Sequence, residues 1–162
     1  MSGSPEMHDE GPRLPMGTEI ARWVNLTRRL EAGPERAYRA LADPEDLARW
    51  FPIQVEGGLA VGGRTTLVWP DRRVSLDVLE AVPNHRFVFR WPWSGDDQMV
   101  TTASVTIEPV GYGSRVMLRD GPFQIDQPGG LDTWAEAVER WSEALTMLRA
   151  YLDFSIDVRI KP

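Results

Sequence analysis

Residues 131–152 read LDTWAEAVERWSEALTMLRAYL, the most regular pattern in the chain. Apolar side chains recur there at alternating steps of three and four, the spacing of one face of an α-helix. They are Leu131, Trp134, Val138, Trp141, Leu145, Leu148 and Leu152. Asp132 is expected to cap this helix. Because such a long apolar face would be unfavourable in water, it must pack against another apolar surface.

That surface is expected from the preceding part of the chain, where short apolar runs alternate with turn residues. The predicted strands cover residues 65–69, 74–82, 86–91, 99–108 and 114–119. Their spacing is typical of antiparallel hairpins. In the third run Phe87, Phe89 and Trp91 share one face, which is expected to point into the core.

A further strand is predicted at residues 22–30, and two short helices follow it. Pro34 suits the first position of a helix that runs to Ala42. Asp43 can cap a second helix that begins at Pro44. The element order therefore predicts an α+β fold in which an antiparallel sheet wraps around the last helix.

Composition excludes several classes of protein. The chain has 162 residues, which suits one domain, and its net charge of −6 argues against a nucleic-acid surface. Without cysteine it has no disulfide, thiol nucleophile or thiolate metal site. No apolar run approaches the roughly 18 residues of a membrane span. A cytoplasmic protein is expected.

Three segments are predicted along the chain. Residues 1–17 are rich in Gly and Pro and predict a disordered tail, and residues 18–153 form the domain. In the extension at 154–162, apolar and polar residues alternate from Phe154 to Ile160. This alternation favours an added strand that pairs with a sheet edge of the same chain or of a second copy, giving a homodimer. A frayed tail is the alternative.

Several motifs resemble one known superfamily. They are AGPERAYRAL at 32–41, DPEDL at 43–47, Trp50-Phe51, Gly62-Gly63, LEAVP at 79–83, FVFRW at 87–91 and Gly113-Ser114-Arg115. The sequence resembles the helix-grip (SRPBCC) superfamily of START and Bet v 1-like proteins. Within it, the sequence is similar to bacterial homologues of the C-terminal domain of the Hsp90 ATPase activator, which overlap the polyketide cyclase-like proteins. The resemblance implies a seven-stranded antiparallel sheet that grips a long helix, with an internal cavity for an apolar small molecule.

Polar residues single out no catalytic or metal site, and no cofactor is expected. His8 lies in the predicted tail and His85 in a turn, so neither has a fixed partner. Among the acids, Asp120 and Asp126 flank the loop before the last helix and are expected to be solvated. A buried carboxylate with a raised pKa would suit cyclase-type chemistry, but the sequence does not identify one.

Tryptophan is the informative residue type, with seven in the chain. An aromatic-lined site for a flat apolar ligand is expected, with Trp69, Phe89, Trp91, Trp134 and Trp141 as its lining and Trp50, Phe51 and Phe123 near its mouth. The alternative is that these rings fill the core, because an empty apolar cavity of ~300 Å³ would cost about 7 kcal/mol.

The leading functional hypothesis is therefore binding of a small hydrophobic or aromatic molecule between sheet and helix, without catalysis. A cyclase or aromatase is the second hypothesis, and it requires a buried ionisable side chain in the cavity. A cochaperone of Hsp90 is the third, and it follows from the resemblance alone.

Overall fold

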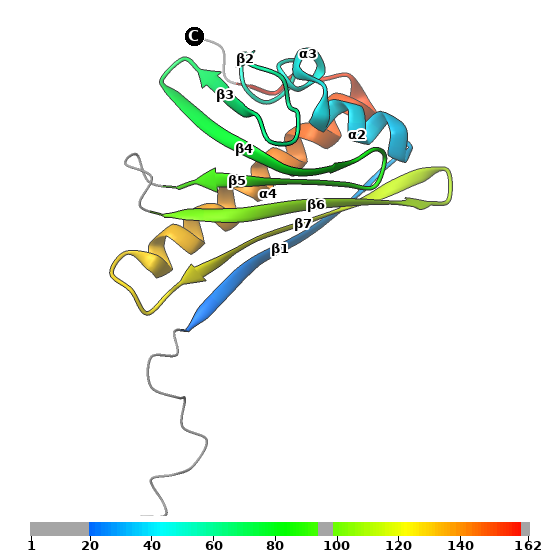
Figure 1. Cartoon of the computed structure of the whole chain (residues 1–162). Coiled ribbons are helices and arrows are strands. Elements are labelled where there is room, and N and C mark those ends of the chain that lie inside the picture. Colours follow the sequence, from blue (N-terminus) through cyan, green and yellow to red (C-terminus); the bar gives the residue numbers. More distant parts are fainter. Residues whose placement is uncertain (1–19, 94–98, 160–162) are drawn as a thin grey trace, which may run out of the picture.

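The computed structural model describes residues 20–93 and 99–159, and the predicted tail at 1–17 lies outside them. Seven antiparallel strands form one sheet in the order β1-β7-β6-β5-β4-β3-β2, with a long helix against one face (Figure 1). The elements are β1 (Ala21–Leu30), α2 (Pro34–Ala42), α3 (Pro44–Leu47), β2 (Gln54–Glu56), β3 (Arg64–Trp69), β4 (Arg72–Val82), β5 (Arg86–Pro92), β6 (Val100–Val110), β7 (Gly113–Gln124) and α4 (Gly130–Phe154). The predicted α+β helix-grip fold, with two short helices between the first two strands, is confirmed.

The core lies between α4 and the face of the sheet that curves around it. Alternate residues of the strands point into this core, as Val105 and Ile107 do from β6 and Val116 and Leu118 from β7. The helix contributes Ala137, Trp141, Ala144, Leu145 and Leu148, all buried. The long helical pattern and the alternating strand patterns therefore meet across one apolar layer.

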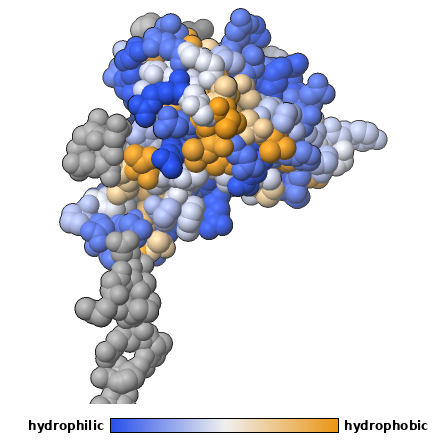
Figure 2. Space-filling view, viewed as in Figure 1, coloured by the Kyte–Doolittle hydropathy of each residue, from blue (hydrophilic) through white to orange (hydrophobic). Residues whose placement is uncertain are grey.

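The opposite face of the sheet is open to solvent. Figure 2 shows this face as mostly hydrophilic, with an apolar area over its middle. Exposed apolar residues of these strands include Leu79 and Val82 of β4 and Val100 of β6. Within the described residues, no helix has both the length and the hydropathy that a membrane crossing requires.

The start of α4 differs from the prediction. Gly129, in the left-handed conformation with φ 77°, occupies the N-cap position instead of Asp132. The buried stripe begins at Gly130, where a Cβ would lie only 1.9 Å from the carbonyl oxygen of Gln124. Leu131 follows one residue later on the helix and is 52% exposed, so its predicted core position is wrong.

Within a single chain, the added strand predicted at residues 154–160 does not form over the part that the structure describes, and pairing with a second copy stays a prediction. Phe154 ends α4, and Ser155 takes the left-handed conformation, so that the Ile156 N–H reaches the carbonyl of Ala150. Residues 155–159 have no strand structure, and Ile160 lies outside the described range. The guanidinium of Arg159 donates to the carbonyls of Ala48, Arg49 and Pro52, which holds this segment over the loop between α3 and β2.

A buried carboxylate ties the two short helices to α4. Asp43 caps α3 as predicted, because its Oδ2 accepts from the N–H of Asp46 at 2.9 Å. The Asp46 residue is 5% exposed, and its carboxylate accepts from Arg36 Nη1 at 2.7 Å and from the Tyr151 hydroxyl of α4. Burial acts to raise the pKa of Asp46, but the hydrogen bonds from Tyr151 and Arg36 outweigh it and hold this pKa below the ordinary 3.8.

Replacing Asp46 by asparagine should lower the free energy of unfolding by about 1–3 kcal/mol, because Arg36 and Tyr151 lose a charged partner. Since the pKa of Asp46 is lowered in the folded state, its contribution is present above pH 3.8 and disappears as the pH falls through the lower folded-state value. Urea unfolding between pH 2 and 7 measures both effects. Exposed Glu45→Gln is the matched control, and an equal loss in both variants would contradict the assignment.

Candidate functional site

Aromatic rings from five parts of the fold form one cluster in the core and at its rim. Trp91 of β5 and Trp141 of α4 lie at its centre, with ring centroids 5.0 Å apart. Phe51, which follows α3, contacts Trp69 of β3 edge-on at 5.1 Å. The cluster includes seven of the predicted site residues, namely Trp50, Phe51, Trp69, Phe89, Trp91, Phe123 and Trp141.

Two tryptophans lie differently from the prediction. Trp134 points away from the cluster, because its indole N–H donates to the carbonyl of Trp23 at 3.2 Å and the Arg22 guanidinium lies 5.0 Å from its ring. Trp93 was not assigned to the site, yet its ring packs against Trp141 at 5.7 Å. Trp93 lies two residues after Trp91, so both side chains point to the same face of the strand. This spacing could have assigned Trp93 to the site from the sequence.

The enclosed space between sheet and helix is small. It measures about 50 Å³ and is lined by apolar side chains such as Phe87, Phe89, Trp141 and Leu145. A protein cavity that accepts benzene measures about 150 Å³, so this space is too small for an aromatic molecule. In the interior, the rings therefore fill the core.

An open groove lies next to this filled interior and measures about 760 Å³. Its walls come from the β3–β4 hairpin, the end of β5, α4 and the C-terminal segment. The aromatic lining is Phe51, Trp69, Trp91, Trp93 and Trp141, and the charged lining is Asp71, Arg72, Arg140, Glu143, Asp157 and Arg159. This volume lies within the range of known small-molecule sites, which combine apolar walls with a few polar groups.

Asp120 lies behind the groove and is wholly buried, so its predicted solvation is wrong. Its Oδ2 accepts from the indole N–H groups of Trp141 at 2.7 Å and of Trp93 at 3.1 Å. Its Oδ1 has no hydrogen-bond partner among the residues that the structure describes. Burial raises the pKa of Asp120, and hydrogen bonds from Thr101 and the two indoles oppose this shift in part.

The sequence carried a signal for this carboxylate. Val116, Leu118 and Asp120 are alternate residues of β7, so all three side chains point to the inward face of the strand. The predicted strand ended at residue 119, whereas β7 continues to Gln124. The shorter predicted strand leaves Asp120 at the edge of the loop before the last helix, where solvation is expected.

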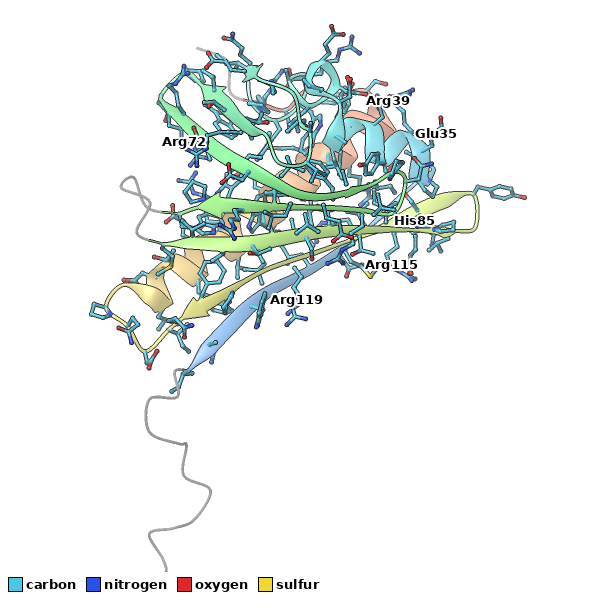
Figure 3. The ribbon with its side chains drawn as sticks, viewed as in Figure 1. Glu35, Arg39, Arg72, His85, Arg115 and Arg119 are labelled. Carbon is cyan, nitrogen blue, oxygen red and sulfur yellow. The ribbon has the colours of Figure 1, made fainter. Side chains whose placement is uncertain are left out.

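The remaining candidate polar residues lie apart from the groove. His85 is exposed in the turn between β4 and β5, at the opposite end of β4 from Arg72 (Figure 3). Across residues 20–93 and 99–159, no group of three or more His or acidic residues is placed to hold a metal ion.

Comparison with known proteins gives a family and a fold. Residues 31–153 match the family described as "Activator of Hsp90 ATPase homolog 1-like protein". The crystal structure of MLL2253 from Mesorhizobium loti is 21% identical with a TM-score of 0.72, covering 83% of this chain and 99% of that chain. CalU16 from Micromonospora echinospora is 23% identical with a TM-score of 0.69, covering 82% and 76%.

The solution structure of the Aha1 dimer from Colwellia psychrerythraea is similar as well. It is 20% identical with a TM-score of 0.71, covering 82% of this chain and 96% of that chain. At such identities the solved structures show the shared fold alone. No curated protein matches the sequence significantly.

Because burial raises the pKa of Asp120, the folded state binds a proton more tightly than the unfolded state, and this residue lowers stability as the pH rises above 3.8. Asp120→Asn keeps an acceptor for both indoles and removes the charge. The difference in unfolding free energy, variant minus wild type, should therefore increase between pH 4 and 8 in urea unfolding. Exposed Asp126→Asn should show no such trend, and a flat difference for Asp120→Asn would contradict the assignment.

Proposed function

The chain belongs to the family of Activator of Hsp90 ATPase homolog 1-like proteins, and we propose that it binds a small hydrophobic or aromatic molecule without transforming it. The open groove beside α4 is the proposed site. Phe51, Trp69 and Trp93 supply most of its aromatic surface, and the nearly buried rings of Trp91 and Trp141 lie behind them. The enclosed space is excluded by its size, so the ligand enters at the rim rather than the centre of the helix-grip core.

The observation that carries this proposal is that the partly buried rings of Phe51, Trp69 and Trp93 line an open space of ligand size. A flat molecule of about ten carbon atoms fits such a groove and removes apolar surface on both sides from water. Trp69 and Phe51 are half-buried, so both retain surface that a ligand can cover. Three other predicted site residues lie beneath the groove and do not line it. Trp50 and Phe89 line the enclosed space, and Phe123 is fully buried behind Trp93.

Catalysis of the cyclase kind would need a carboxyl group that reaches the ligand. Asp120 has the burial and the raised pKa for such a role. Its carboxyl, however, belongs to the lining of neither the groove nor the enclosed space, and the indoles of Trp93 and Trp141 separate it from the groove. The geometry therefore favours binding over proton transfer. Cochaperone activity toward Hsp90 takes its support from the family name alone.

Titration with 2-naphthamide, a flat neutral probe, should quench tryptophan fluorescence of the wild-type protein with saturation. Calorimetry should show that Trp69→Ala weakens the affinity about three- to tenfold, because one aromatic contact is lost. Trp134→Ala is the matched control, since its ring lies outside the groove, and its affinity should equal that of the wild type. Binding that depends on Trp134 and not on Trp69 would refute the site.

A further inference from the structure

Building on the proposed function, we propose that the groove selects an aromatic carboxylate, whose ring lies against the tryptophans and whose carboxylate pairs with Arg72 and Arg140. The ligand class is thus a small aromatic monoanion rather than a neutral or cationic aromatic. Two guanidinium groups from separate elements carry this inference, one on the β3–β4 hairpin and one on α4.

Arg72 is placed beside the aromatic surface by the hairpin. It pairs with Trp69 across the turn Pro70-Asp71, and its guanidinium carbon lies 4.6 Å from the centroid of the Trp69 ring. Within the described part of the chain, its side chain makes no hydrogen bond or ion pair with a carboxylate, so its N–H donors remain for a ligand. Figure 3 shows Arg72 at the hairpin end of β4, well separated from Arg119 and Arg115.

Arg140 brings a second cation to the same groove. Its Nε donates to Glu136 at 2.9 Å on the same helix, and among the described contacts its terminal nitrogens have no partner. Desolvation lowers the pKa of Arg72, and the positive charge of Arg140 lowers it further, while Asp71 and Glu136 act in the opposite direction. The two guanidiniums therefore repel one another across the groove, and an anion between them would relieve this repulsion.

The other charged groups of the lining do not offer the same recognition. Arg159 is already engaged, because it donates to Asp157 and to three backbone carbonyls. Asp71 and Glu143 are exposed carboxylates that remain solvated. A carboxylate on an aromatic ring is planar, so it can meet a guanidinium through two parallel N–H···O bonds while the ring stays against Trp69 and Trp93.

The experiment compares three probes that share one ring system, namely 2-naphthoate, 2-naphthamide and 2-naphthylmethylammonium. In calorimetric titrations of the full chain, 2-naphthoate should bind about tenfold more tightly than 2-naphthamide, because its hydrogen bonds are charge-assisted. The ammonium probe should bind more weakly than the amide. Added NaCl should weaken binding of the naphthoate more than binding of the amide.

Variants then test the two arginines. Arg72→Gln should reduce the naphthoate-to-amide affinity ratio to about two or less, and Arg140→Gln, on a different element, should reduce it as well. Arg119→Gln is the matched control, because Arg119 also lies over a half-buried tryptophan, Trp23, at 4.1 Å but outside the groove. It should leave the ratio unchanged.

The outcomes separate this inference from the proposed function. Equal affinity of the wild type for the carboxylate and the amide, or a ratio that survives both Arg72→Gln and Arg140→Gln, would overturn the charge selection and leave aromatic binding intact. Failure of all three probes to bind would overturn the proposed function and this inference together. Tighter binding of the ammonium probe would assign the recognition to Glu143 and Asp71 instead.

Discussion

The indole of Trp141 is the contact on which the site depends. Its ring contacts Phe51, Phe89, Trp91 and Trp93, and its N–H donates to the buried carboxylate of Asp120 at 2.7 Å. Because a buried indole N–H needs an acceptor, this hydrogen bond fixes the orientation of the ring while the ring itself joins α4 to β5. The same ring forms a wall of the groove, so helix packing and groove shape are set by one side chain.

The size of the aromatic side chains explains why the ligand space lies at the rim. An empty apolar cavity of ~300 Å³ in the core would cost about 7 kcal/mol, which is comparable with the whole free energy of unfolding of a small domain. The rings of Phe89, Trp91 and Trp141 reduce the enclosed space to about 50 Å³. The groove, which is open to water, carries no such cost, and there the rings keep surface that a ligand can cover. Arg72 and Arg140 lie at this rim, and Arg72 is only partly desolvated there.

Much of the fold was predictable because it depends on periodicity. The apolar stripe of α4 and the shared face of Phe87, Phe89 and Trp91 were both confirmed, since burial of one face is a local property of the sequence. The core position of Leu131 was wrong, and residues 155–159 form no strand within the chain. Gly130 and the left-handed Ser155 set the ends of α4 through backbone contacts that periodicity does not report. The short edge strand β2 has three residues, too few to show alternation. The burial of Asp120 follows from its position on the inward face of β7, and the position of Arg72 follows from its pairing with Trp69 in the β3–β4 hairpin. Both can be predicted only when the ends of these strands are known.

Indole N–H resonances in a ¹H–¹⁵N spectrum, recorded during titration with 2-naphthoate, report directly which tryptophans contact the ligand. The seven tryptophans give separate reporters, and shifts are expected for Trp69, Trp91, Trp93 and Trp141, which line the groove. The resonances of Trp23 and Trp134 should stay in place, because both lie outside it. Shifts confined to Trp23 and Trp134, or no shifts at a saturating concentration of the probe, would contradict binding in the groove.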